Sequence, residues 1–159
     1  MIKMFNKLNY LRSNRITQVK LPISAAAQEL SAALLVATDY RQRQELGESL
    51  LDELCDGANM DIVHLTVNDA NQKHRRRNGR IVMKRYGLYK IRDRAIHIEN
   101  RTAARGQIIS AKSFLDTLLH EWLHHYDTLK LKLNSIHSKG FYDRFNDLKE
   151  KLRIPKKNR

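Results

Sequence analysis

Residues 110–131 read SAKSFLDTLLHEWLHHYDTLKL and form the most regularly patterned stretch of the chain. Apolar residues recur there at spacings of three and four, which predicts an amphipathic α-helix with one buried face. Ser110 or Ser113 can cap the start of this helix, because a serine hydroxyl accepts hydrogen bonds from the free amides of the first turn. On a helical wheel, His120, Glu121 and His124 lie outside the apolar stripe.

These three residues form the pattern His-Glu-x-x-His. Side chains four residues apart on a helix lie one turn apart, with Cβ atoms about 5–6 Å from each other. His120 and His124 can therefore bind one zinc ion together. Glu121, on the adjoining part of the face, can serve as general base toward the water that such an ion binds. The competing interpretation is a solvated helix face that is rich in histidine.

A catalytic zinc ion needs a third protein ligand and one open position. We expect His137 to be that ligand, because it lies just before a potential Ser138 cap, where a turn can return the chain to the metal. Asp127 is the alternative candidate for the third ligand. A straight helix carries it away from a metal between His120 and His124, so we expect it to orient an imidazole instead. His125 lies next to the apolar arc and is expected to be packed.

Upstream, the apolar period changes from helical to alternating. Residues 62–69, IVHLTVND, alternate apolar and polar side chains, which predicts a half-buried strand. Arg80–Ile91 and Ala95–Glu99 are predicted as second and third strands, and Asn78-Gly79 is a hairpin signal. Such short connections predict an antiparallel meander. An extended substrate could pair with an exposed edge of this sheet.

Helical patterns flank these strands. One begins at a potential Ser24 cap and runs to Leu54 as one long helix or two shorter ones, with Gly47 as a possible break. Asp56-Gly57 then ends the pattern. A last helix is expected after Ser138, with Phe141 and Phe145 on its apolar face. The predicted class is α+β.

Composition sets the limits for these elements. The 159 residues, 42% of them hydrophobic, suffice for one packed domain, which we place at 23–154. Residues 1–22 contain no acidic residue and are expected to be a loosely attached basic arm with a short helix near 5–11. Residues 155–159 form a basic tail. We expect a cytoplasmic protein without a signal peptide, a membrane span or an internal disulfide, since Cys55 is the single cysteine.

Basic residues are in excess, and ten of them lie between Lys73 and Arg94. There are 30 Lys and Arg residues against 17 Asp and Glu, a net charge of +13. Such a cluster favours weak, non-specific contact with nucleic-acid phosphates, although a solvated charged hairpin has the same composition. The candidate phosphate contacts are Arg75, Arg76, Arg77, Arg80, Lys84 and Arg85.

Three segments resemble the SprT-like zinc metallopeptidases, the family of Spartan-type proteases that act on DNA–protein crosslinks. They are LLHEWLHHYD (118–127), HSKGFYDRF (137–145) and the upstream NGRIVMKRYGLYKIRDRAIHIENR (78–101). The resemblance covers roughly residues 60–150. It implies one zinc ion on His120, His124 and His137, with Glu121 as the base. It also implies a reduced zincin fold, with an N-terminal helix, a three-stranded antiparallel sheet, the active-site helix and a C-terminal helix.

The expected function is therefore zinc-dependent hydrolysis of peptide bonds in proteins, including proteins on DNA. Tyr126, Tyr142 and Arg144 lie close enough in sequence to donate to the developing oxyanion, and the sequence does not choose among them. The alternative from a different class is a basic nucleic-acid-binding module whose zinc site is only structural. A peptidase that stays latent until a partner binds is a further alternative. No feature indicates an oligomeric state.

Overall fold

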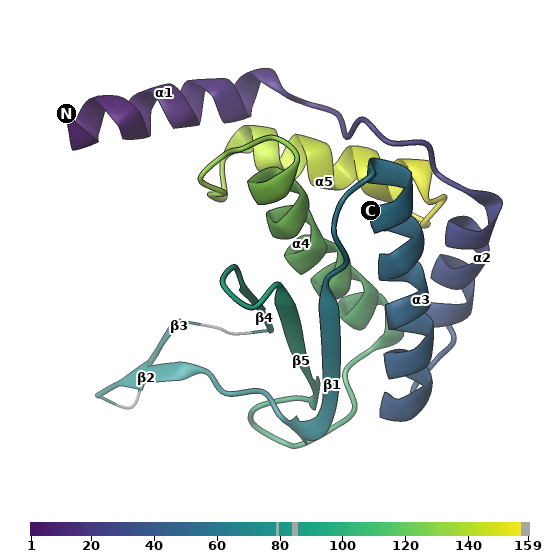
Figure 1. Ribbon diagram of the computed structural model, residues 1–159. Coiled ribbons are helices and arrows are strands. Elements are labelled where there is room, and N and C mark those ends of the chain that lie inside the picture. The colour runs from purple at the N-terminus through teal and green to yellow at the C-terminus, as the bar shows by residue number, and fades with distance from the viewer. Residues whose placement is uncertain (79, 84–85, 157–159) are drawn as a thin grey trace.

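The computed structural model describes residues 1–78, 80–83 and 86–156, and within them the chain forms an α+β fold (Figure 1). Its elements in chain order are α1 (Ile2–Arg15), α2 (Ala25–Leu34), α3 (Tyr40–Ala58), β1 (His64–Asn71), β2 (Arg75–Arg77), β3 (Arg80–Met83), β4 (Gly87–Lys90), β5 (Ala95–Arg101), α4 (Ala111–Leu129) and α5 (Lys139–Lys151).

A small mixed sheet forms one layer, in the order β1-β5-β4. β5 is central, with β1 parallel on one side and β4 antiparallel on the other. The inward residues of neighbouring strands pair directly, Leu65 with Ile96 and Val67 with Ile98, and all four are buried. α3 packs against β1, and α4 packs against β4 and β5. The core therefore lies between this face of the sheet and the helices.

The predicted antiparallel meander is wrong. After β1 the chain leaves the sheet, forms the separate β2–β3 hairpin and returns through β4, so that β5 runs parallel to β1. Figure 1 shows this hairpin projecting away from the helices. The single strand predicted over Arg80–Ile91 is β3 and β4, with residues 84–85 between them outside the described part. Alternation identifies which face of a strand is buried, but it does not identify the strand's partner.

Capping residues set the helix starts. Ser24, Ser110 and Ser138 each accept a hydrogen bond from an amide in the first turn of α2, α4 and α5 respectively, which confirms Ser24 and Ser138 as caps and selects Ser110 over Ser113. The break between α2 and α3 falls at residues 35–39, and Asp39 caps α3. Gly47 is therefore not a break. It lies within α3, where a Cβ would be 2.6 Å from Leu65 Cδ2.

The N-terminal segment is more structured than the expected arm with a short helix near 5–11. α1 spans fourteen residues, and its first half is exposed. The end of α1 and the chain after it are packed, because Ser13, Val19 and Leu21 are buried. The expected loose attachment is therefore wrong for residues 13–21. In the described part of the chain, no helix has both the length and the apolar character needed to cross a membrane.

Candidate metal centre

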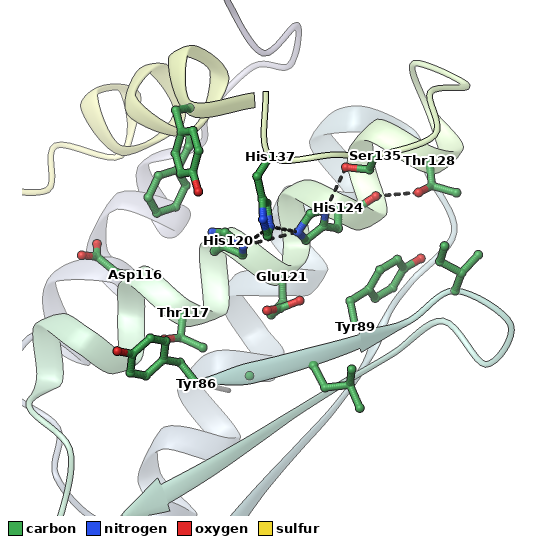
Figure 2. A pocket seen from close by; sticks show the side chains of 15 residues that line it. Tyr86, Tyr89, Asp116, Thr117, His120, Glu121, His124, Thr128, Ser135 and His137 are labelled. Carbon is green, nitrogen blue, oxygen red and sulfur yellow. Dashed lines mark hydrogen bonds between the residues drawn. The ribbon is translucent and has the colours of Figure 1, made fainter. Parts of the chain in front are cut away.

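α4 is the rigid support of the site. Its apolar stripe packs into the core, where Phe114, Leu118, Trp122 and Leu123 are fully buried. The side chains outside the stripe project toward β4 on one side and toward the α4–α5 loop on the other (Figure 2). A helix buried along one face keeps the remaining faces in a fixed orientation. The local pattern around residue 120 therefore fixes where these side chains point.

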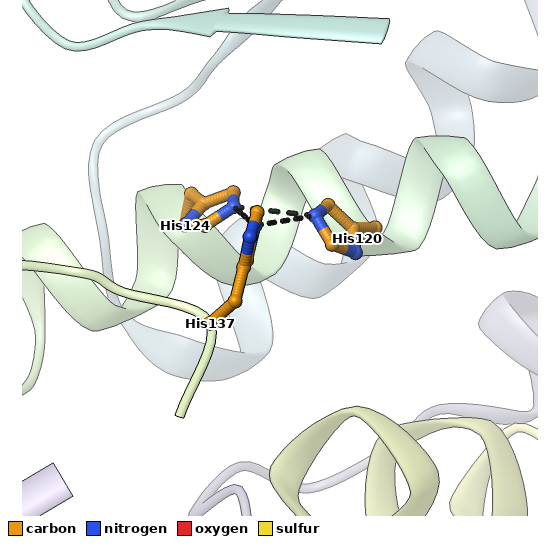
Figure 3. A group of neighbouring side chains, drawn as sticks. All are labelled: His120, His124 and His137. Carbon is orange, nitrogen blue, oxygen red and sulfur yellow. Dashed lines mark hydrogen bonds between the residues drawn. The ribbon is translucent and has the colours of Figure 1, made fainter. Parts of the chain in front are cut away.

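Three imidazoles meet at one point. The Nε2 atoms of His120 and His137 are 3.0 Å apart, those of His124 and His137 are 3.0 Å apart, and those of His120 and His124 are 3.3 Å apart. Figure 3 shows the rings of the two α4 histidines and of His137 converging. Nitrogens bound tetrahedrally at about 2.0–2.1 Å from one ion lie about 3.3 Å apart. The three residues are therefore close enough to bind a single metal ion, as the spacing predicted.

Hydrogen bonding alone does not account for this arrangement. A ring nitrogen of neutral histidine is either a donor or an acceptor. Among three mutually close Nε2 atoms, at least two are of the same kind, so at least one of the three contacts is unfavourable. Burial lowers the pKa of His120 to about 4 and that of His124 to about 3, and the neighbouring histidines add to both effects. Two neutral imidazoles thus face the centre at neutral pH, which is the form that a cation needs.

A hydrogen-bond chain through Ser135 fixes the tautomer of His124. Ser135 Oγ donates to Asp127 Oδ2 at 3.1 Å and lies 2.8 Å from His124 Nδ1. Because the single hydroxyl proton goes to Asp127, the Nδ1–H of His124 is the donor in the second contact. Its Nε2 therefore keeps a lone pair that faces His120 and His137. Asp127, which we expected to orient an imidazole, reaches His124 through Ser135, a residue that sequence reasoning missed.

Asp127 is itself held by a buried ion pair. Arg144 donates from Nε and Nη2 to the two carboxylate oxygens at 3.0 and 2.8 Å, and both side chains are fully buried. Burial raises the pKa of Asp127, while Arg144 opposes that rise. Arg144 is therefore not available as an oxyanion donor. Tyr126 is not available either, because it is fully buried and does not line the cavity.

Aromatic rings of α5 cover the outer side of the cluster. The Phe141 ring stacks on His124 with centroids 4.6 Å apart and lies 4.9 Å from the ring of His120. Tyr142 is 45% exposed, and its ring centroid is 6.1 Å from that of His137. Tyr142 also lines the cavity in front of the cluster, as neither Tyr126 nor Arg144 does. Of the three candidate oxyanion donors, it is the one with access to that space.

Glu121 lies beside the cluster on the face of α4 that approaches β4 (Figure 2). It is 9% exposed, and burial raises the pKa of its carboxyl group to about 7, against the effect of a backbone hydrogen bond from Tyr89. Strand and helix are close here because Gly87 has no side chain. A Cβ on Gly87 would lie 2.6 Å from Thr117 Cγ2 and 3.2 Å from Glu121 Cγ. A carboxyl group with this pKa can exchange a proton near neutral pH.

The imidazole cluster and Glu121 line one cavity of about 640 Å³. Its walls come from β4 and the residues around it, from α4, and from the α4–α5 loop together with the start of α5. The lining residues outside the cluster include Tyr86, Leu88, Tyr89, Ile91, Thr128 and Phe145. The space is therefore large enough for several side chains of a ligand and is partly apolar.

The remaining predicted residues lie away from the cluster or outside the described part. His125 is packed as expected, between the Tyr89 hydroxyl at 2.7 Å and the Asp61 carbonyl at 2.9 Å. The candidate phosphate contacts fall on the β2–β3 hairpin, where the structure describes the backbone alone, or outside the described residues. The first group is Arg75, Arg76, Arg77 and Arg80, and the second is Lys84 and Arg85.

Comparison of the chain with models of protein families, with curated proteins and with solved structures finds no match.

Proposed function

We propose that this chain is a zinc-dependent metallopeptidase of the SprT-like type, with a reduced zincin fold, that hydrolyses peptide bonds in proteins. One observation carries the proposal. Three histidine Nε2 atoms lie within 3.3 Å of each other, and a buried carboxylate lines the same cavity. Zinc is the ion that best suits a set of neutral imidazoles with one open position.

The proposed mechanism assigns a separate role to each group. His120, His124 and His137 would hold the ion, and a bound zinc ion would supply Lewis acidity and an activated water. Glu121 takes a proton from the attacking water and delivers it to the leaving amine, a role that its position on the cavity wall beside the three histidines supports. Tyr142 lines the cavity, and its hydroxyl would donate to the developing oxyanion.

The open edge of β4 offers pairing sites to an extended polypeptide. β4 pairs with β5 on one edge, and no described strand pairs with its other edge. Gly87, Leu88 and Tyr89 of this strand line the cavity next to Glu121. A peptide that added to the open edge would form backbone hydrogen bonds with little dependence on its sequence. This arrangement supports a protein substrate.

The number of ligands argues against the alternative of a purely structural zinc site. Structural sites are closed by four protein ligands, whereas catalytic sites keep one position open. Among the described residues, the group holds three histidines, and no fourth ligand joins them. A basic binding module would not need a proton-accepting carboxyl group in the same cavity. The catalytic interpretation accounts for both features.

The test compares Glu121→Gln with Glu45→Gln, a control of the same chemistry at an exposed position of α3. We expect Glu121→Gln to keep its zinc content and to stay folded while cleavage of labelled casein falls by at least about 100-fold. His137→Ala should lose the zinc. Assays are run with and without duplex DNA and cell extract, because a latent enzyme needs its activator.

Two results would contradict the proposal. Cleavage by Glu121→Gln at the rate of Glu45→Gln would remove Glu121 as the base. A wild type that binds zinc but cleaves nothing under any of these conditions would favour the binding-module alternative.

A further inference from the structure

The third histidine stands on an irregular loop. Residues 130–138 join α4 to α5 without helix or strand. Among the backbone hydrogen bonds that hold this loop are those from Leu133 to the Asp127 carbonyl and from Ser138 to the Ile136 carbonyl. A loop of this kind has many accessible conformations unless other parts of the chain restrict it. Contacts from outside the loop must therefore fix the position of His137.

α1 supplies such contacts, although it lies more than a hundred residues earlier. The Asn9 side chain donates to the Asn134 carbonyl at 2.8 Å and accepts from the Asn134 amide at 2.9 Å. Arg12 donates to the carbonyls of Leu131 and Lys132. These contacts precede Ser135 and His137 in the loop.

The end of α1 also holds the far side of the loop. Ser13 Oγ lies 2.7 Å from Ser138 Oγ, the cap of α5. α1 and α5 approach so closely at this point that a Cβ on Gly140 would collide with the Ser13 carbonyl oxygen. The segment that carries Ser135 and His137 is thus bracketed by contacts to a single helix.

A second, buried path joins α1 to the same site. Arg144 Nη1 donates to the carbonyls of Ser13 and Ile16 at 2.7 and 2.6 Å. Its Nε and Nη2 hold Asp127, which accepts from Ser135. The end of α1 and the imidazole-orienting serine are therefore linked through one guanidinium group.

We propose that α1 is a positioning element of the metal site, in which Asn9, Arg12 and Ser13 hold the α4–α5 loop so that His137 faces the two histidines of α4. This inference rests on the proposed metal site and gives the N-terminal segment a role in it. His120 and His124 are fixed by the packing of α4. The position of His137 depends on α1. Removing the α1 contacts therefore displaces this third ligand and leaves the other two in place.

The experiment uses the double variant Asn9→Ala/Arg12→Ala in the full chain. Both side chains lie at the surface or are half-buried, so the metal-free protein should melt close to the wild type. We expect its zinc affinity, measured by competition with a chromophoric chelator, to fall by about 10-fold. The visible absorption of its Co²⁺ form should shift toward that of His137→Ala, because both changes disturb the same ligand. Asn6→Ala, at an exposed position of the same helix, is the matched control and should behave as wild type.

The outcomes separate this inference from the metal site itself. If His137→Ala loses metal but the double variant keeps wild-type affinity and a wild-type Co²⁺ spectrum, α1 does not position the ligand and the inference is overturned. If the wild type binds neither ion, the metal site fails and the inference fails with it. If the metal-free double variant melts well below the wild type, the single variant Asn9→Ala decides in the same assays, because it removes both hydrogen bonds to Asn134.

Discussion

At the scale of single residues, the site depends on which atoms carry protons. Ser135 gives its hydroxyl proton to Asp127 and so makes His124 a donor at Nδ1, which leaves a lone pair at Nε2. Glu121 differs from His124, because burial favours its protonated form and raises its pKa to about 7. Both side chains owe their protonation state to neighbours that lie far from them in sequence or across the cavity.

The pKa of Glu121 makes a prediction for the metal-free protein. The unfolded chain releases this proton near pH 4.5, and the folded chain holds it up to about pH 7. The stability that the protonated group contributes is therefore complete below about pH 4.5 and is lost as the pH rises through 7. Glu121→Gln lacks this loss. Measured by urea unfolding with EDTA present, the free energy of unfolding of Glu121→Gln should rise relative to that of wild type by up to about 3 kcal/mol between pH 5 and pH 8.

The comparison isolates one group, because both proteins contain the same histidines and their contributions cancel. A difference between the two proteins that stays constant from pH 5 to pH 8 would show that Glu121 ionises as an ordinary surface carboxyl group does.

At the scale of elements, the site depends on the close approach of α4 and β4. Gly87 is the first residue of β4 and faces Thr117 and Glu121 of α4. The strand forms the cavity wall opposite the imidazoles, so the width of the cavity at Glu121 follows from the separation of these two elements. Any side chain at position 87 must displace the side chains of Thr117 and Glu121 or move the strand itself.

We therefore expect Gly87→Ala to reduce peptidase activity by about 10-fold or more while leaving the three histidines able to bind zinc. The added Cβ would lie 2.6 Å from Thr117 Cγ2 and 3.2 Å from Glu121 Cγ, so Thr117, Glu121 or β4 must shift. Thr117→Ser removes that methyl group. The double variant Gly87→Ala/Thr117→Ser should regain part of the activity, measured as casein cleavage at equal zinc content. If the double variant is no more active than Gly87→Ala, steric crowding at Thr117 is not the cause of the loss.

At the scale of the whole molecule, charge is distributed unevenly along the chain. Ten of the 30 Lys and Arg residues fall between Lys73 and Arg94, the segment that contains the β2–β3 hairpin. This hairpin projects from the rest of the fold (Figure 1). From a protruding basic hairpin on a chain of net charge +13 we propose weak, non-specific DNA binding, which would bring the proposed peptidase to proteins on DNA.

Binding to duplex DNA should therefore depend steeply on salt. A protein that makes about four phosphate contacts loses on the order of 100-fold in affinity between 50 and 200 mM salt. In fluorescence anisotropy, Arg75→Ala/Arg76→Ala/Arg77→Ala should bind more weakly than wild type and show a shallower salt slope. The control variant Lys3→Ala/Lys7→Ala/Arg41→Ala removes the same charge elsewhere. Equal losses in the two variants would indicate general attraction without a hairpin site, and absent binding at low salt would exclude DNA as a partner.

Much of the helical framework could be predicted from sequence because its signals are local. The serines at 24, 110 and 138 cap helices through amides only three residues away. The strand faces of Leu65, Val67, Ile96 and Ile98 follow from alternation. Strand direction and the division of Arg80–Ile91 into two strands could not be predicted, since pairing depends on partners that no local period identifies.

Local patterning was enough to place His120, Glu121 and His124 on one helix, because a spacing of four residues and the helical period act within a single turn. It also indicated that His137 would join them. Only the tertiary structure decided what holds His137 there, namely α1 and the chain from Arg144 through Asp127 to Ser135. The physical reason is that an irregular loop has no period of its own, so contacts from distant segments of the chain determine its conformation.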